Sequence, residues 1–322
     1  MAAIVDGVRP GHAELVATEL ATNLTRHATS GGHVLLRRAG NGIELIAADD
    51  GPGLPPGSLP AGGNGAGTGP PSVPVQDAVS MHNGSLGVGL AGVKRLAHDF
   101  DCYSGPRGTV ILARIGAPAA AVAGGFRWGG VDVPLSGAGE SGDAWAVAAG
   151  QRFSVAMVDG LGHGPAAAGA AAAAISAFHA APPGDPAAYL RRAHEAMRGT
   201  RGGVLTACEI DPGRDELSYI GVGNIGGQVL VGGQCQSLAG RDGVVGAGLA
   251  PPQGRAARYR WGPGATLVLA SDGIRSPWDL PAYPGLLRHC PAVIAATLHR
   301  DLARGTDDAS VLVVADTRGE AQ

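Results

Sequence analysis

The chain has 322 residues, enough for two domains that each bury a core of their own. Its formal net charge of −3, without a basic block, argues against a nucleic-acid-binding surface, and its N-terminus lacks the pattern of a signal peptide. Four scattered cysteines without a CxxC spacing indicate a reduced setting, so we expect a cytoplasmic protein.

The first predicted element is a helix at residues 14–28. Its apolar residues recur every four positions and should face a core: Val16, Leu20 and Leu24. Glu19, Asn23 and His27 recur with the same spacing, about 60° around the helix. This second stripe places a carboxylate, an amide and an imidazole at the edge of the buried face. Taken alone, it is also the pattern of a solvated helix face.

A buried strand that begins near residue 42 runs into the sequence DDGPGL. A carboxylate at a strand end, here Asp49, can accept a hydrogen bond from the amino group of a base, and Gly51 and Gly53 let the backbone lie close to a ligand. A tight turn would explain the same residues. The stretch at 55–76, rich in Gly and Pro, predicts a loop that is either disordered or a lid over a site.

The sequence SLGVGLAGVKRL at 85–96 predicts a glycine turn followed by a helix. Gly87 and Gly89 would let backbone N–H groups approach a polyphosphate at the helix N-terminus, where the helix dipole also favours negative charge. In a chain with 55 glycines, such a pair alone is also an ordinary turn. The half closes with the strand GTVILA, near whose start Thr109 lies.

In this order, the motifs at residues 14–114 resemble the ATPase fold shared by gyrase, Hsp90 and histidine kinases, and most of all the RsbT-like anti-sigma and switch-protein serine kinases. DDGPGL, GVGLAGVKRL and the DF that follows carry this likeness. The resemblance implies that Glu19 is the general base for a protein serine or threonine hydroxyl, that Asn23 holds Mg²⁺, and that Asp49 binds the adenine amino group. It further implies that the pocket for ATP with Mg²⁺ is shaped by Gly51, Gly53, Gly87, Gly89 and Thr109.

One feature departs from these kinases: only 13 residues precede Glu14, fewer than the strand and partial helix that usually stand there. The resemblance therefore supports ATP binding and leaves kinase turnover open.

The small-residue stretch APAAAVAGG at 117–125 separates this half from the next. It has neither charge nor periodicity, and a new strand pattern, FRWGGVDVPLSG, follows it. We predict an ATP-binding domain at 1–117, a linker at 118–125 and a second domain at 126–318.

The second half repeats one arrangement, an apolar strand with an aspartate at its start or end. The strands are expected in SGDAWAV, FSVAMVDG, TLVLASDG and TDDASVLVVA, and their aspartates are Asp143, Asp159, Asp272, Asp307 and Asp308. Acidic strand ends can converge on one edge of a sheet sandwich, and such oxygen-rich clusters suit Mg²⁺ or Mn²⁺ rather than zinc. Two ions about 3.5–4 Å apart could activate a water and polarise a phosphoryl group. A turn explains one Asp-Gly pair well, but it does not explain the whole set.

This half, about residues 126–316, resembles the metal-dependent, type 2C-like phosphatases of the SpoIIE family, and among them the RsbX-like feedback phosphatases. GDAW, DGLGHG, GVGNIGG, SDGI and TDD carry the likeness. The resemblance implies metal ligands at Asp143, Asp159, the carbonyl of Gly160, Asp272 and Asp307, with Asp308 as the alternative to Asp307. Many relatives carry an acid where this chain has Ala146, which leaves any third metal open.

Two further residues have no metal role in this interpretation. His163 would either position its loop or protonate a leaving group. Cys208 is expected to pack in a strand, and the Ala-rich run at 165–181 in a helix that does not span a membrane.

Together the resemblances predict an α+β protein: a Bergerat-type ATP-binding α/β sandwich followed by a four-layer α-β-β-α phosphatase sandwich. The expected function is that of a partner-switching regulator. Its C-terminal half would use two Mn²⁺ or Mg²⁺ ions to hydrolyse phosphoserine or phosphothreonine on a STAS-type protein, within a sigma-factor regulatory complex. Its N-terminal half would bind ATP and would either act as a protein serine kinase or sense ATP. Two alternatives stay open: a single-activity phosphatase whose N-terminal half is a nucleotide-sensing or docking module, and an inert scaffold. No nucleic-acid or membrane partner is expected.

Overall fold

The computed structural model describes residues 8–54, 89–117, 122–135, 139–181 and 184–318. The chain divides into two units, Met1–Ala119 and Ala120–Gln322. Within the described residues, no helix has both the length and the apolar character needed to cross a membrane.

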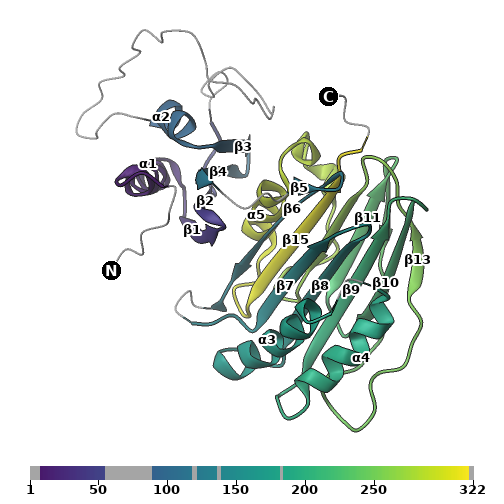
Figure 1. The fold of residues 1–322 in the computed structure, drawn as a ribbon. Helices are drawn as coiled ribbons and strands as arrows, with labels where there is room; N and C mark the ends of the chain where they lie inside the picture. Colours follow the sequence, from purple (N-terminus) through teal and green to yellow (C-terminus); the bar gives the residue numbers. More distant parts are fainter. Residues whose placement is uncertain (1–7, 55–88, 118–121, 136–138, 182–183, 319–322) are drawn as a thin grey trace. The chain divides into compact units, whose positions relative to one another are not determined.

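In its described residues, the N-terminal unit is a four-stranded antiparallel sheet that carries two helices (Figure 1). The strand order is β1–β2–β4–β3. The strands are β1 (Gly32–Ala39), β2 (Asn41–Asp49), β3 (Asp99–Gly105) and β4 (Gly108–Ala117), and the helices are α1 (His12–His27) and α2 (Gly89–Leu96).

Helix α1 forms with the predicted face toward the sheet. Val16 and Leu20 are fully buried and Leu24 is partly buried. They pack on apolar residues of the sheet and of α2, including Leu45, Val93 and Ile111. Because residues four apart share a face of a helix, the periodicity of the sequence was sufficient to predict this packing.

The C-terminal unit contains two antiparallel sheets. The five-stranded sheet has the order β13–β10–β9–β8–β7, with strands Ala257–Arg260, Glu216–Val222, Gly203–Asp211, Phe153–Gly160 and Asp143–Ala149. The six-stranded sheet has the order β12–β11–β14–β15–β6–β5, with strands Gln234–Ser237, Gly226–Val231, Thr266–Ala270, Ala309–Asp316, Phe126–Val133 and Val122–Ala123. Two short 3₁₀ helices lie at Leu280–Ala282 and Leu286–Arg288.

Helices cover the outer faces of both sheets (Figure 1). Helices α3 (Pro165–His179) and α4 (Pro186–Met197) pack on the five-stranded sheet, and α5 (Pro291–Leu302) packs on β15 and β6. A core with large buried side chains such as Phe153, Met157 and Trp261 fills the space between the sheets. The predicted α-β-β-α sandwich is therefore confirmed.

The Ala-rich sequence of α3 has a packing role. Its residues Ala167, Ala170, Ala171 and Ala174 are buried against the five-stranded sheet and α4. Small side chains let a helix approach its neighbours closely, which explains the many alanines of this helix. Strand β5, Val122–Ala123, lies within the predicted linker and pairs with the start of β6.

Candidate active site

In the N-terminal unit, Asp49 lies at the end of β2 and is buried. Its Oδ1 atom accepts hydrogen bonds from the backbone N–H of Gly51 (2.9 Å) and of Thr109 (3.1 Å). The Thr109 hydroxyl lies 3.1 Å from that of Ser104, which in turn accepts from the backbone N–H of Leu54 (2.7 Å). The end of β2, the DDGPGL loop and the start of β4 are thus tied together around one carboxylate.

Close backbone approaches explain the two glycines of this loop. A Cβ atom at Gly51 would collide with the carbonyl of His27, at the end of α1. Gly53 has a left-handed φ of 83°, and a Cβ atom there would meet the carbonyl of Gly105. The neighbouring Asp50 accepts hydrogen bonds from the backbone N–H groups of residues 29–31, which lower its pKa. The loop is therefore fixed between the end of α1 and β3.

Helix α1 carries the remaining predicted residues of this pocket. Glu19 is buried, Asn23 is half-buried, and the side chain of His27 is exposed. Within the described part of the chain, the Nδ2 atom of Asn23 is buried without a hydrogen-bond partner. An unpaired amide can donate to a phosphate oxygen or, with the amide turned, offer its oxygen to a cation. Gly89, with φ 53°, begins α2, and Gly87 lies outside the described residues.

In the C-terminal unit, the first two predicted metal ligands face each other. Asp143 begins β7, Asp159 lies next to the end of β8, and the two are directly paired in the register of these strands. The glycine after Asp159 is required by packing, because a Cβ atom at Gly160 would collide with the backbone carbonyl of Ala167 in α3. Helix α3 therefore begins directly beside the metal-binding candidates.

The other three aspartates belong to the second sheet. Asp272 follows β14, and Asp307 and Asp308 immediately precede β15, which pairs with β14. A Cβ atom at Gly273 would collide with the backbone carbonyl of Asp308. Asp272 Oδ2 accepts a hydrogen bond of 2.7 Å from the side-chain amide of Asn224.

The effect of these carboxylates on one another indicates that all five aspartates belong to one cluster. Burial raises the pKa of Asp159 to about 8, with further increases from the charges of Asp143, Asp272, Asp307 and Asp308. Burial likewise raises the pKa of Asp143 to about 7, against hydrogen bonds from Ser271 and Ser310 that lower it. Since repulsion between carboxylates acts over short distances, the structure brings all five predicted aspartates together.

Asp307 and Asp308 differ in what their carboxylates contact. Asp308 is buried, and its two oxygens accept hydrogen bonds of 2.6 Å from the backbone N–H groups of Leu135 and Gly142. Asp307 Oδ1 accepts only a local hydrogen bond, from the N–H of Asp308 (2.9 Å). The geometry therefore favours Asp307 over Asp308 as a ligand, because Asp308 already holds the segment that leads into β7.

Two further polar residues, Asp132 and Asn224, belong to this cluster and were not among the predicted site residues. Asp132 on β6 accepts hydrogen bonds from the hydroxyls of Ser141 (2.6 Å) and Ser310 (2.9 Å), and its charge raises the pKa of Asp143. Asn224 holds Asp272. The turn GVGNIGG was a signal for Asn224, but Asp132 lies within a strand pattern that gave none.

The remaining predicted positions lie around the cluster. His163 is exposed in the loop between β8 and α3. Ala146 is buried on β7 among residues that pack under α3, so the position of a further acid in relatives is part of the core here. Cys208 is buried in β9, as predicted.

The oxygen atoms of the cluster determine whether it is suited to bind metal ions. Over the residues that the structure describes, no three acidic, His or Cys side chains stand close enough to hold an ion as they are. The Oδ2 atom of Asp143, however, is a buried carboxylate oxygen without a hydrogen-bond partner among the residues that the structure describes. Such an atom costs free energy unless it is protonated or meets a cation, and carboxylate oxygens are the donors that Mg²⁺ and Mn²⁺ prefer. The donor set fits.

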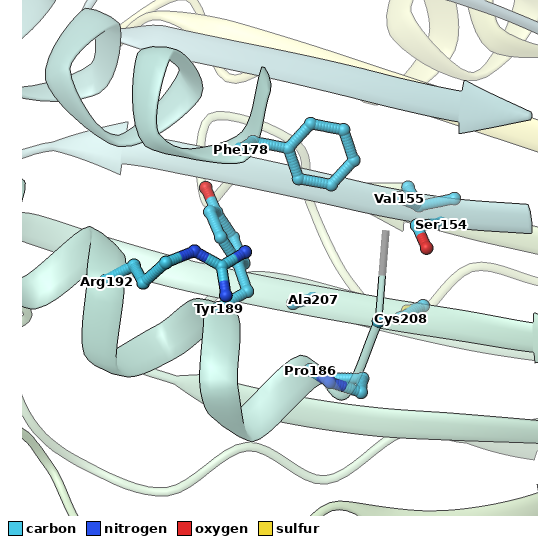
Figure 2. Close-up of a pocket in the computed structure, with 9 residues that line it drawn as sticks. Ser154, Val155, Phe178, Pro186, Tyr189, Arg192, Ala207 and Cys208 are labelled. Carbon is cyan, nitrogen blue, oxygen red and sulfur yellow. The ribbon is translucent and has the colours of Figure 1, made fainter. Parts of the chain in front are cut away.

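Two cavities in this unit differ in their relation to the cluster. One has a volume of ≈ 440 Å³ and is lined by Asn224, Asp272, Trp278, Arg304, Thr306 and Asp307, among others. The other, of ≈ 10 Å³, is lined by residues of α4 such as Arg192 and Tyr189, and by Ser154 of β8 and Cys208 of β9 (Figure 2). It has room for about one water molecule, which could satisfy the unpaired Ser154 hydroxyl. The first cavity contains two of the clustered aspartates, Asp272 and Asp307, in its lining, so it is the candidate active-site cavity.

An α-β-β-α sandwich with carboxylates gathered at strand ends from both sheets is the architecture of PP2C-type serine/threonine phosphatases. Comparison with known families agrees. Residues 149–315 match the family model of stage II sporulation protein E (SpoIIE), and residues 9–118 match that of the histidine kinase-, DNA gyrase B- and HSP90-like ATPases. Because the first match spans more than half of the chain, the protein belongs to the SpoIIE family. The N-terminal unit is a histidine kinase-, DNA gyrase B- and HSP90-like ATPase domain.

Solved structures agree with this fold. A structure from work on the bacterial stressosome, "a modular system that has been adapted to control secondary messenger signaling", is 27% identical, with a TM-score of 0.54 over 59% of this chain and 98% of that one. RsbX in complex with magnesium is 18% identical, with a TM-score of 0.51 over 60% of this chain and 96% of that one. No curated protein sequence matches the chain significantly.

Proposed function

We propose that the C-terminal unit hydrolyses phosphoserine or phosphothreonine on a STAS-type regulatory protein by two-metal catalysis. The single observation that supports this most strongly is the convergence of five carboxylates from two sheets, with one buried oxygen, Asp143 Oδ2, left unpaired. A cluster of this charge needs cations to be ionised at neutral pH. The magnesium bound in RsbX, a protein of the same fold, is consistent with this.

In this proposal, Asp143, Asp159, Asp272 and Asp307 hold two Mn²⁺ or Mg²⁺ ions, together with the carbonyl of Gly160. When bound, the ions would supply an activated water and polarise the phosphoryl oxygens for in-line attack. Each protein group around them has a positioning role. Asn224 orients the carboxylate of Asp272 by its hydrogen bond of 2.7 Å.

Asp308, Ser271 and Ser310 complete the surroundings. Asp308 fixes the segment before β7 through its bonds to Leu135 and Gly142, and so sets the place of Asp143. The hydroxyls of Ser271 and Ser310 stabilise the ionised form of Asp143. His163, exposed in the loop after Asp159, positions this loop or protonates the leaving group.

The kind of relative supports the choice of substrate. The 27% identical structure comes from work on the stressosome, so a regulatory phosphoprotein of a partner-switching system, with a STAS domain, is the substrate that we propose. The protein would act in the cytoplasm, on a complex that regulates a sigma factor.

A phosphatase assay with Mn²⁺ tests the proposal directly. The wild-type chain should release phosphate from p-nitrophenyl phosphate and from a phosphorylated STAS protein, and EDTA should abolish both activities. Asp159→Asn should abolish them as well. Asp185→Asn, at the N-cap of α4, is the control, because this aspartate accepts a hydrogen bond from the N–H of Ala187 and caps a helix. If the wild type releases no phosphate even at millimolar Mn²⁺, the proposal fails.

For the N-terminal unit, we propose ATP binding with Mg²⁺ and transfer of phosphate to a serine or threonine of the same class of protein. Asp49, held by the N–H groups of Gly51 and Thr109, would bind the adenine amino group. Asn23, whose amide is unpaired, would hold Mg²⁺, and the buried Glu19 would be the general base. The rival proposal is a nucleotide-sensing or docking module without turnover.

Two measurements separate these possibilities. Calorimetry with ATP and Mg²⁺ should detect binding that Asp49→Asn weakens. Glu19→Gln should keep ATP binding but lose transfer of labelled phosphate to a STAS protein, while Glu14→Gln, an exposed residue of the same helix, should change neither. If Glu19→Gln transfers phosphate as well as the wild type does, the kinase proposal is wrong. Binding without any transfer supports the sensing module.

A further inference from the structure

The cavity of ≈ 440 Å³ lies directly beside two of the proposed metal ligands, Asp272 and Asp307. Its volume falls within the range of pockets that bind small ligands. Its lining combines polar residues with the apolar side chains of Ile274 and Trp278, and the ring of Trp278 packs over Gly226. A pocket of this kind can take a side chain with an apolar stem and a charged end.

Arg304 is the cationic residue among those that line this cavity. Its backbone N–H donates to the carbonyl of Gly273 (2.8 Å), and its Nε donates to the carbonyl of Asp272 (2.9 Å). The two segments are further joined by the N–H of Arg275, which donates to the carbonyl of Leu302 (2.9 Å). The guanidinium is therefore fixed to the same loop that carries a proposed metal ligand.

The two terminal nitrogens of Arg304 have no hydrogen-bond partner in the part of the chain that the structure describes, and the side chain is exposed. Their N–H groups are thus available to a ligand. A guanidinium held at one nitrogen, with two others available, matches the geometry of a phosphate group. It also offsets the repulsion that a phosphate dianion would meet from the aspartates.

Two other arginines near the cluster, Arg201 and Arg275, do not line the cavity. Arg201 lies against the loop after β8, where one of its nitrogens would be 3.1 Å from a Cβ atom at Gly162. Arg275 donates from its guanidinium to the carbonyl of Asp301 (2.9 Å).

We propose that this cavity binds the phosphorylated side chain of the substrate and that Arg304 donates hydrogen bonds to its phosphoryl oxygens. The inference rests on the phosphatase function proposed above. In this arrangement, Arg304 contacts the phosphate from the side of Asp272 and Asp307, and Trp278 contacts the carbon atoms of the phosphorylated residue.

The experiment compares Arg304→Gln and Arg304→Lys with the wild type, and uses Arg275→Gln as the matched control from the same loop. Steady-state kinetics on p-nitrophenyl phosphate at saturating Mn²⁺ give kcat and KM, and inorganic phosphate serves as a product inhibitor. Arg304→Gln should raise the KM and the inhibition constant of phosphate by roughly tenfold to hundredfold, the usual effect of losing a hydrogen bond to a charged group. Arg304→Lys should recover part of the loss, and Arg275→Gln should behave as the wild type.

The affinity for Mn²⁺ distinguishes this role from a purely structural one. If Arg304 only supports the Asp272 loop, Arg304→Gln will weaken Mn²⁺ binding and leave the inhibition constant of phosphate unchanged, and the proposal is overturned. Equal values of all constants in the variant and the wild type overturn it too.

Calorimetric titration of inorganic phosphate into the Mn²⁺-loaded chain provides a test that does not depend on catalysis. A wild type that binds phosphate but hydrolyses nothing would refute the phosphatase function, while weaker phosphate binding by Arg304→Gln would still support the site. Equal phosphate binding by both proteins would refute the site alone.

Discussion

Asp307 and Asp308 are neighbours in the chain, yet their carboxylates have different environments. Asp308 accepts two backbone hydrogen bonds, whereas Asp307 is half-buried and has only a local one. We expect Asp307→Asn to reduce phosphatase activity by more than the roughly 10–100-fold usual for residues that only support metal ligands, with little change in unfolding.

Asp308→Asn should have the opposite profile. An amide can accept with its oxygen only, so the N–H of Leu135 or Gly142 would lose its partner, at a cost of about 1–3 kcal/mol in the free energy of unfolding. Urea unfolding and Mn²⁺-dependent activity of both variants test the pair. If Asp308→Asn loses its activity without losing stability, the assignment of the ligand must be reversed.

At the scale of single residues, the sequence predicted the five aspartates because each stands next to an apolar strand. It left Asp307 and Asp308 as alternatives, since only the fold places Leu135 and Gly142 against one of them. Asp132 escaped prediction for a similar reason. Its partners Ser141 and Ser310 belong to other segments, and Ser310 is 178 residues away in the chain.

At the scale of elements, Asp-Gly pairs are places where two strand ends or a strand and a helix approach closely. A Cβ atom at Gly273 would collide with the Asp308 carbonyl. We expect Gly273→Ala to destabilise the C-terminal unit by about 1–3 kcal/mol, the usual cost of overpacking, and to lower Mn²⁺ affinity because the loop of Asp272 must move.

Gly169→Ala is the control for this prediction. Gly169 lies within α3, and a Cβ atom there has no neighbour within 4 Å. Alanine should therefore stabilise the helix by about 0.5–1 kcal/mol. Urea unfolding followed by tryptophan fluorescence measures both variants. A Gly273→Ala variant as stable as the wild type would show that the two loops have room to separate.

Elements with strong periodicity, such as α1 and the apolar strands, were predictable from the sequence, because one buried face decides their structure. The strand β5 was not: Val122–Ala123 is short and its pairing with β6 depends on a neighbour, not on its own composition. The same is true of Ala146, which sequence comparison alone would place near the metals and which packs under α3.

At the scale of the whole molecule, the carboxylate cluster should determine how the stability of the metal-free protein changes with pH. In the unfolded chain an aspartate has a pKa near its ordinary value of 3.8, and in the folded, metal-free unit burial raises the pKa of Asp143 to about 7 and that of Asp159 to about 8. At pH values between the ordinary pKa of 3.8 and the raised pKa of about 8, the folded state binds more protons than the unfolded state does. Its stability must then fall as the pH rises from about 5 to 8.5.

Bound cations reverse this balance, because they favour the ionised carboxylates. The increase in melting temperature caused by Mn²⁺ should therefore be larger at pH 8.5 than at pH 5.5. The chain has four tryptophans, Trp128, Trp145, Trp261 and Trp278, all within the C-terminal unit, so fluorescence reports on this unit alone. Asp159→Asn, which removes one of the two groups, should flatten the pH dependence of the EDTA-treated protein. The metal-free protein could instead become more stable as the pH rises from 5.5 to 8.5. A positively charged side chain would then have to neutralise the carboxylates of the cluster.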